Sequence, residues 1–138
     1  MSTSVGTNIN VENTRKIYAA VPVGDVDTVF GLLDPEVVIR YYGVPEIPYS
    51  GTFEGLAGAG DFFTRVGGSV RVLAMEPLTF ISEGDNLAVW GHLIFERLET
   101  GVRFESDFAH IISLRNGKWL HFRDFMNSAI AADVFRTR

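Results

Sequence analysis

The feature that most constrains the fold is the stretch from Val70 to Asn127, in which β-branched and aromatic runs alternate with turn signals. The three turn signals are Glu83-Gly84-Asp85-Asn86, Glu99-Thr100-Gly101 and Arg115-Asn116-Gly117-Lys118. Asn-Gly is the strongest of them, because both central residues of a type I′ turn need a positive φ. Four strands joined by hairpins are therefore predicted over residues 70–127.

Apolar residues at helical spacing precede these strands. Ile17 and Val21 lie one turn apart. A second group repeats at the spacing of a buried helix face: Val26, Val29, Phe30 and Leu33. Two short helices are predicted, separated by Pro22, with Asp25 as the N-cap of the second. Asp34-Pro35 is expected to end it, because the residue before a proline is disfavoured in the helical region.

The middle of the chain predicts a strand, a loop and a third helix. Residues 37–42 are β-branched and aromatic, whereas 43–55 form a long segment with two prolines. Apolar residues over 56–66 follow helical spacing, and Gly67-Gly68 is expected to stop this helix. Helices followed by a meander of strands indicate an α+β fold, with the helices on one face of a strongly bent antiparallel sheet.

The composition is that of a single globular domain over residues 1–138, with a flexible N-terminus at 1–10 and a closing helix or frayed tail at 128–138. The net charge is −5 and no run of Lys or Arg interleaves with aromatic residues, so nucleic acid is not an expected partner. Cysteine is absent and the three histidines lack metal-site spacing, so no metal site is expected. Without a signal peptide or an apolar run near the roughly 20 residues of a membrane span, a soluble cytoplasmic protein with no membrane partner is expected.

Several short strings give the chain a family resemblance. They are Gly24-Asp25-Val26-Asp27, Tyr49-Ser50-Gly51-Thr52-Phe53-Glu54-Gly55, Asp107-Phe108-Ala109-His110, and Arg115-Asn116-Gly117-Lys118 followed by Phe122-Arg123-Asp124-Phe125. With the predicted order of elements, over roughly residues 11–136, they resemble the SnoaL-like group of the nuclear-transport-factor-two-like superfamily, which also contains ketosteroid isomerases, limonene epoxide hydrolases and polyketide cyclases. The resemblance implies a cone-shaped curved antiparallel sheet, packed on three N-terminal helices around a pocket for a small hydrophobic molecule.

The Asn116-Gly117 turn predicts which late polar residues share a face of the sheet. With only those two residues in the turn, Ala109 faces Asp124, and Asp107 and Asp124 become diagonal neighbours on one face. The opposite face would carry Phe108, His110, Ile112, Trp119, His121, Arg123 and Phe125. The resemblance to the epoxide hydrolases implies that the Asp124 face lines the cavity.

The preceding hairpin leaves two alternatives. A two-residue Thr100-Gly101 turn would bring Trp90 and His92 onto the face of Asp107. A three-residue loop that starts at Glu99, with Gly101 left-handed, would put Gly91 and Leu93 there instead. We favour the three-residue loop, which places His92 on the other face.

The late acids suggest acid-base chemistry. Two carboxylates close together in an apolar cavity cannot both ionise cheaply, so one can act as an acid while the other acts as a base. Asp124 is the predicted base, with Asp107 or His110 as its partner. The structural alternatives are satisfied strand positions or ion pairs for the two carboxylates, and an interface position for His110 and Arg123.

The resemblance separates the chemistries of the family. The isomerases' first-strand base falls at Tyr41 or its neighbour, their late aspartate at Ala109 or His110 and their helix tyrosine near Tyr18, so two of their three functional residue types are missing. The arginine and second aspartate of the epoxide hydrolases fall on Gly91 and Leu93, which cannot replace them. Polyketide cyclases need a single carboxylate base in a shaped apolar cavity, and Asp124 can supply it.

The predicted ligand contacts are Tyr18, Tyr41, Tyr42, Phe62, Phe63, Trp90 and Arg123. Two functions follow. One is an enzyme of cyclase-like or isomerase-like type that acts without a cofactor on an apolar carbonyl or hydroxyl compound. The other is a noncatalytic hydrophobic-ligand-binding or dimerisation module. Because both faces of the last hairpin are apolar, a homodimer through the sheet face of Trp119, His121 and Arg123 is also expected.

Overall fold

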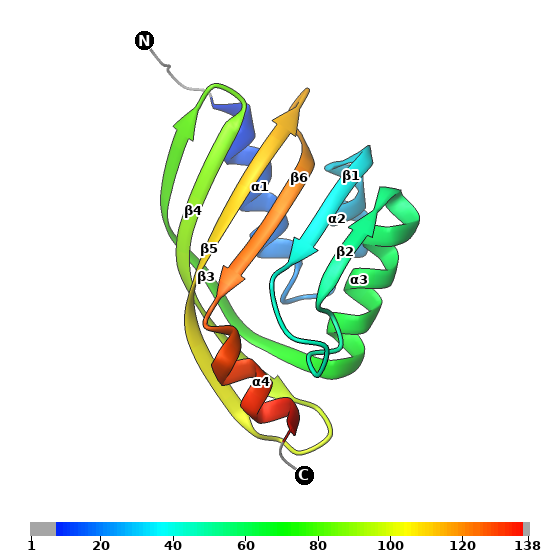
Figure 1. The fold of residues 1–138 in the computed structure, drawn as a ribbon. Helices are drawn as coiled ribbons and strands as arrows, with labels where there is room; N and C mark the ends of the chain where they lie inside the picture. The colour runs from blue at the N-terminus through cyan, green and yellow to red at the C-terminus, as the bar shows by residue number, and fades with distance from the viewer. Residues whose placement is uncertain (1–7, 137–138) are drawn as a thin grey trace.

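A computed structural model describes residues 8–136 as a six-stranded curved sheet with four helices (Figure 1). The elements are α1 (Ile9–Ala20), α2 (Val26–Gly31), β1 (Leu33–Tyr41), β2 (Gly51–Glu54), α3 (Gly55–Ser69), β3 (Val70–Glu83), β4 (Asn86–Arg97), β5 (Arg103–Arg115), β6 (Lys118–Met126) and α4 (Ser128–Arg136). The strand order is β2-β1-β6-β5-β4-β3, and every pair is antiparallel except β1 with β6, which is parallel. The α+β cone is confirmed.

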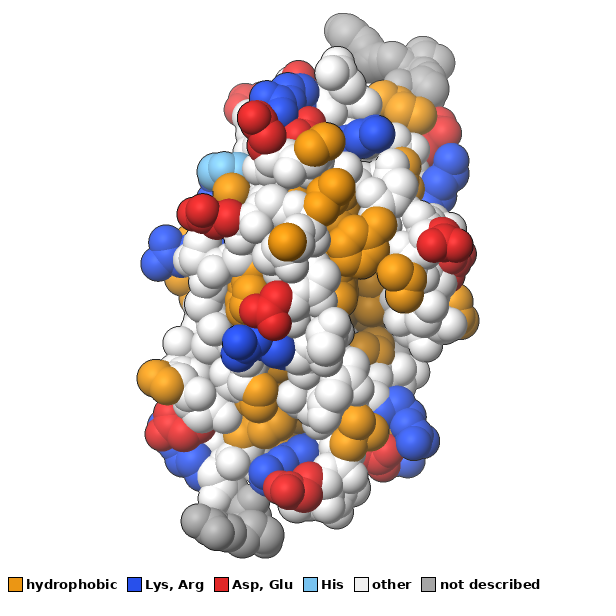
Figure 2. Space-filling model, turned by 90° about the vertical axis from the view of Figure 1, so that its right-hand side faces the viewer, with side chains coloured by type: hydrophobic (Ala, Val, Ile, Leu, Met, Phe, Trp, Pro, Cys, Tyr) orange, Lys and Arg blue, Asp and Glu red, His pale blue; other side chains and the backbone are white. Residues whose placement is uncertain are grey.

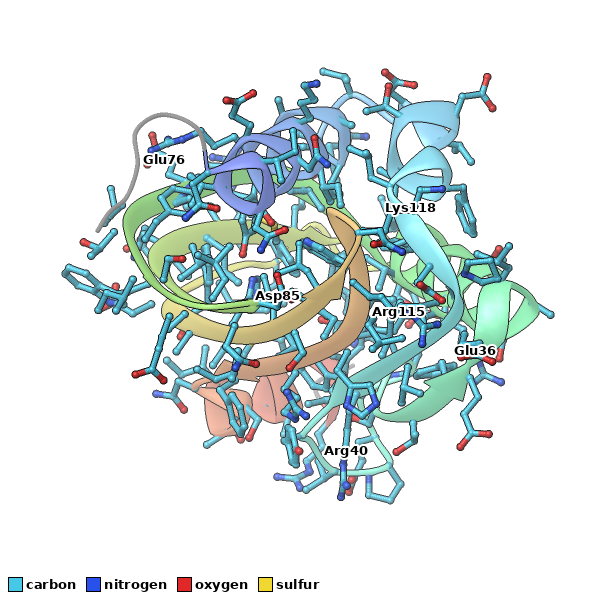
Figure 3. All side chains as sticks on the ribbon, turned by 90° about the horizontal axis from the view of Figure 1, so that it is seen from above. Glu36, Arg40, Glu76, Asp85, Arg115 and Lys118 are labelled. Carbon is cyan, nitrogen blue, oxygen red and sulfur yellow. The ribbon has the colours of Figure 1, made fainter. Side chains whose placement is uncertain are left out.

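The sheet bends around a core that the first three helices cover. In Figure 1 α1, α2 and α3 lie behind the sheet, and seen from above in Figure 3 the strands β3 to β6 curve around the interior. Side chains that alternate along β1, β4 and β5 are fully buried there, among them Ile39, Val89 and Ile112. β3 bends at two register irregularities, one of them beside Pro77, and β3 is an edge strand that tolerates a proline.

The predicted turns are confirmed at their glycines. Asn116 and Gly117 both have positive φ, at 55° and 76°, as a type I′ turn requires. Gly84 and Gly101 are also left-handed. The loop that contains Gly101 holds four residues rather than three. Arg97 N–H donates to the carbonyl of Val102 at 2.8 Å, so these two residues are the last pair of the hairpin and residues 98–101 form its loop.

The second helix ends earlier than the Asp34-Pro35 signal predicted, and the first strand begins earlier. β1 starts at Leu33 because Trp119 N–H donates to the Leu32 carbonyl at 2.9 Å, which pulls the chain into the sheet. Arg115 then holds Asp34 and Glu36 at 2.8 Å each, at the end of the molecule labelled in Figure 3. Trp119 and Arg115 belong to the last hairpin, so the sequence near the start of β1 could not predict these contacts.

Three further boundaries differ from the sequence analysis. α3 runs through Gly67-Gly68 to Ser69, since neither glycine has a positive φ and the helix passes directly into β3. A short strand, β2, lies within the predicted loop. At the N-terminus, residues 1–7 of the expected flexible segment lie outside the described residues, whereas Asn10 belongs to α1 and donates to Asp85 at 3.2 Å. None of the helices within residues 8–136 is long and apolar enough to cross a membrane.

Candidate active site

A β-bulge in β6 decides which polar side chains face the interior. The hairpin starts in the expected register, but Leu120 is an extra residue without a partner, and the register shifts by one beyond it. His110 therefore pairs with Asp124, which Ala109 was expected to face. The predicted common face of Asp107 and Asp124 is wrong, because the shift turns them to opposite faces of the sheet.

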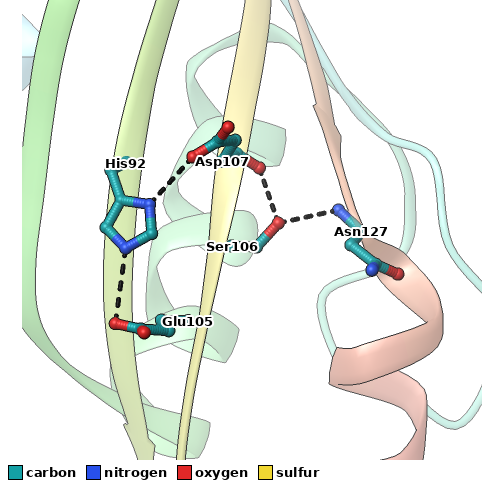
Figure 4. Close-up of polar contacts among 5 residues, drawn as sticks. All are labelled: His92, Glu105, Ser106, Asp107 and Asn127. Atoms are coloured by element: carbon teal, nitrogen blue, oxygen red, sulfur yellow. Dashed lines mark hydrogen bonds and ion pairs between the residues drawn. The ribbon is translucent and has the colours of Figure 1, made fainter.

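Asp107 lies on the outer face, where its side chain is 63% exposed. Its carboxylate lies 2.9 Å from Nδ1 of His92, whose Nε2 lies 3.3 Å from Glu105. Figure 4 shows both contacts as dashed lines. The Asp107 hydrogen bond and then that of Glu105 raise the pKa of His92. His92 and Asp107 pair directly because the β4–β5 loop has an even number of residues, so the favoured three-residue loop was wrong.

Four other predicted residues also lie on the side of the sheet opposite to the one expected. Three predicted ligand contacts face outward, and one residue of the predicted dimer face points inward. Trp90 is 50% exposed, and Tyr42 stacks on Phe125 outside the cavity. Arg123 donates to Nδ1 of His121 at 2.9 Å. Trp119, expected beside them in a dimer face, is instead 2% exposed and lines the cavity. Trp119 precedes the bulge and keeps the face that it shares with His110, and this face is the interior one. The bulge turns only the residues beyond it, so His121 and Arg123 lie on the outer side.

The interior brings together Asp124, His110 and Tyr18 in one hydrogen-bonded chain. Tyr18 Oη lies 2.6 Å from Nδ1 of His110, and Nε2 of His110 lies 3.1 Å from Oδ1 of Asp124. Burial and then the charge of Asp124 raise the pKa of Tyr18, so its hydroxyl keeps its proton. With the imidazole hydrogen on Nε2, Nδ1 accepts from Tyr18 and Nε2 donates to Asp124. The chain fixes one carboxylate oxygen, and no hydrogen bond within residues 8–136 engages Oδ2.

α1 is anchored to the last hairpin, and this anchoring places Tyr18. Thr14 Oγ1 accepts a hydrogen bond from Nε1 of Trp119 at 3.0 Å, and Asn13 donates to the Gly117 carbonyl at 2.7 Å. Tyr18 lies one turn beyond Thr14, on the same buried side of the helix. Its ring stacks on His110 with centroids 5.7 Å apart, which holds the imidazole from one side.

Two more tyrosines reach the same interior without partners for their hydroxyls. Tyr41 pairs with Asp124 across β1 and β6, and Tyr49 packs on Tyr41 with ring centroids 5.0 Å apart. Among the described residues, neither hydroxyl has a hydrogen-bond partner, although both side chains are buried. Burial is the main cause that raises the pKa of each, and the charge of Asp124 adds to it. Buried groups of this kind are rare and need an explanation, such as a bound molecule.

These polar groups meet in a partly open pocket that we call the inner chamber. Its volume is about 60 Å³, and its polar lining consists of Asp124, His110, Tyr18, Tyr41 and Tyr49. Phe62, Phe63, Trp119 and Phe122 contribute to its apolar walls. The structure thus brings six predicted residues together here, namely Asp124, His110, Tyr18, Tyr41, Phe62 and Phe63, and leaves Asp107, Tyr42, Trp90 and Arg123 outside. Within residues 8–136 no three His, Asp or Glu side chains converge on one point as a metal site would need.

Tyr49 is the polar residue of the inner chamber that the sequence analysis missed as a ligand contact. It lies in the loop between β1 and β2, next to Ile47, and both side chains are 1% exposed. Gly43 lets this loop fold back, since a Cβ at that position would come within 2.6 Å of the Tyr41 ring. The available signal was the Tyr49-Ser50-Gly51 string, which carried the family resemblance but gave no direction for the side chain.

The arrangement is suited to moving a proton in an apolar setting. A carboxylate has one oxygen fixed by a histidine and the other free, and two phenol hydroxyls stand ready to donate. A carboxylate base beside hydrogen-bond donors can take a proton from a carbon acid and stabilise the charge that forms on its oxygen.

Comparison with known proteins agrees with this architecture. Residues 14–122 match the SnoaL-like domain family. No curated protein matches the chain. An NTF2-like protein of unknown function from Burkholderia pseudomallei is similar with a TM-score of 0.84 and 22% identity, covering 95% of this chain and 100% of that one. TerC co-crystallised with polyporic acid has a TM-score of 0.82 and 24% identity, over 94% and 100% of the two chains. A putative isomerase from Rhodopseudomonas palustris has a TM-score of 0.81 and 14% identity, over 96% and 100%.

At these identities the structural neighbours speak for the fold alone, whereas the family match covers well over half of the chain. The predicted resemblance is confirmed. The chain belongs to the SnoaL-like domain family.

Proposed function

We propose that this protein is an enzyme that moves a proton at the carbon next to a carbonyl group in a small apolar compound, with Asp124 as the base. The reaction is of the cyclase or isomerase type, and the residues of the chain are sufficient for it without a cofactor. The observation that carries the proposal is the pair of buried, unpartnered hydroxyls of Tyr41 and Tyr49 beside Asp124.

The proposed step assigns one role to each polar group. Oδ2 of Asp124 takes the proton, and the electron pair of the broken C–H bond moves into the carbonyl, whose oxygen gains the negative charge. Tyr41 and Tyr49 donate hydrogen bonds to that oxygen. The enolate then recovers a proton at another carbon, as in an isomerase, or attacks a second carbonyl carbon, as in a cyclase. His110, supported by Tyr18, positions Asp124 through Oδ1.

The surroundings favour this chemistry. The walls of the inner chamber are mainly apolar and aromatic, so hydrogen bonds to a developing charge there are stronger than in solution. The raised pKa values of both tyrosines keep their hydroxyls protonated and able to donate. Among similar structures, those from Rhodopseudomonas palustris and Bacillus subtilis are described as putative isomerases, and TerC was crystallised with polyporic acid.

The alternative is a noncatalytic module that binds a hydrophobic ligand in the same place. The small volume and mainly apolar lining of the inner chamber favour it. A binding module gives no role to the way in which His110 and Tyr18 hold the carboxylate of Asp124. It predicts that replacing Asp124 by a neutral residue removes no catalytic activity.

The test is hydrogen exchange at carbon. The protein is incubated in D2O with cyclohexanone and a series of 2-alkanones, and NMR follows the loss of the signals of protons next to the carbonyl. We expect native protein to accelerate exchange, and Asp124→Asn to lower the rate by about 100-fold or more because the base is gone. The amide oxygen of Asn can still accept from His110, so circular dichroism should show an intact fold.

Asp107→Asn is the matched control, because this aspartate lies on the outer face. Its exchange rate should equal that of the native protein. Exchange no faster than in buffer across the whole panel would refute the enzyme and favour the binding module. Loss of the fold in Asp124→Asn would assign this residue a structural role instead.

A homodimer through the outer face of the sheet remains our proposal, with a corrected set of residues. Trp119 is excluded because it is buried inside. The exposed apolar side chains of the outer face are Trp90, Ile111, Phe125 and Tyr42, at 36–50% exposure. Contiguous apolar surface of this kind is typical of an interface, and a second copy would cover it with the same residues.

A further inference from the structure

A second hollow adjoins the inner chamber, and we call it the outer groove. It lies between the α1–α2 turn, α2, the end of α3 and the start of β3, and its volume is about 360 Å³. Its walls are mainly apolar, with Val26 and Val29 on one side and Gly67 on the other. Figure 2, which looks at the side of the molecule where α3 lies, shows hydrophobic side chains gathered in a furrow there.

The two spaces share part of their walls. Val21, Phe63, Val66 and Val72 line both the inner chamber and the outer groove. Phe30, which lines only the groove, packs edge-on against Phe63 with ring centroids 5.9 Å apart. These four side chains therefore form the wall between the two spaces, and a ligand that occupies both spaces must displace at least one of them.

The sizes of the two spaces limit what can reach Asp124. Pockets for drug-sized ligands measure roughly 300–1,000 Å³, and the inner chamber at about 60 Å³ holds only a few atoms. The groove alone is large enough for the bulk of a small organic molecule, but Asp124, His110 and Tyr18 do not line it. Neither space is sufficient by itself, and together they match a molecule with a small polar end and a longer apolar body.

We infer that the ligand is an elongated amphiphile whose carbonyl end enters the inner chamber while its apolar body lies in the outer groove between α2 and α3. The identity of the polar end rests on the proposed function, whereas the place of the body rests on the groove. Asp25 lies at the rim of the groove, where its carboxylate caps α2 and accepts from Thr28 N–H at 3.2 Å and from Thr28 Oγ1 at 2.6 Å. These hydrogen bonds engage the carboxylate within the protein, so it does not bind the ligand. Length of the apolar body is thus the property that the groove selects.

The test uses two neighbouring glycines of α3. A Cβ at either Gly67 or Gly68 would point into open space, and replacing a helical glycine favours the helix. Only Gly67 lines the groove, so Gly67→Trp fills it while Gly68→Trp adds the same side chain outside. The ligands are 2-butanone, 2-pentanone, 2-heptanone and 2-nonanone, and their Kd values are measured by NMR titration.

For native protein and Gly68→Trp we expect Kd to fall by about fourfold per added methylene. For Gly67→Trp we expect 2-butanone to bind as in native protein and the gain with length to disappear. A native protein whose affinity does not depend on length, or a Gly67→Trp variant that keeps the full dependence, would overturn the inference. Length-dependent binding without exchange at carbon would reject the enzyme and keep the groove, whereas exchange without length dependence would do the reverse.

Discussion

Replacing Tyr18 by Phe removes one hydroxyl and keeps the ring that packs on His110. The Nδ1 atom of His110 then loses its partner at 2.6 Å in a side chain that is only 1% exposed. Leaving a buried acceptor unsatisfied costs about 1–3 kcal/mol of the free energy of unfolding. With an unfolding entropy of about 2.1 cal/mol/K per residue, the melting temperature of a chain of this length should fall by roughly 3–10 °C.

Tyr41→Phe is the matched control, because it removes a hydroxyl that has no partner. We expect its melting temperature to stay within about 2 °C of native, or to rise, since a buried unsatisfied group is removed. Differential scanning calorimetry of both variants measures the contrast. The exchange assay should respond in the opposite sense, with the larger loss of rate in Tyr41→Phe, whose hydroxyl is placed to contact the ligand.

Equal melting temperatures for Tyr18→Phe and native protein would refute the hydrogen-bonded chain. The same holds if Tyr41→Phe is destabilised as much as Tyr18→Phe, because the two hydroxyls would then have similar surroundings. Either result would remove the reason for assigning His110 a fixed tautomer and Asp124 a fixed oxygen.

Two further predictions concern the outer face. Trp90→Glu should shift the protein from dimer to monomer in sedimentation at micromolar concentration, while Val23→Glu, also at an exposed apolar position, should leave it dimeric; a monomeric native protein would contradict the dimer. The raised pKa of His92 means that its contribution to stability is present below the unfolded value near 6.5 and is lost as pH rises through the higher folded value. Native protein should therefore exceed His92→Gln in melting temperature at pH 5.5 and match it at pH 9, and a constant difference would show that the contacts of His92 with Asp107 do not titrate.

Most of the fold was predictable because it is specified locally. Asn116-Gly117 is the pair that a type I′ turn requires, and the alternation of apolar residues along β4 and β5 marks strands with a buried face. Asp25 also caps α2 as its position predicted. Such signals involve neighbours in the sequence, so they operate before distant parts of the chain meet.

The composition of the site was decided by tertiary packing at Leu120. A turn fixes the register of a hairpin only as far as the first bulge, and the bulge at Leu120 lets both Trp119 and Phe122 point inward, where they are 2% and 6% exposed. An unbroken strand would turn residues three apart to opposite faces and expose one of these rings. Apart from β2, the sequence alone determined the elements and their order. Burial of two aromatic rings against α1 and the core decided that Asp124 meets His110 instead of Asp107, because that burial outweighs the interrupted strand pairing at one residue.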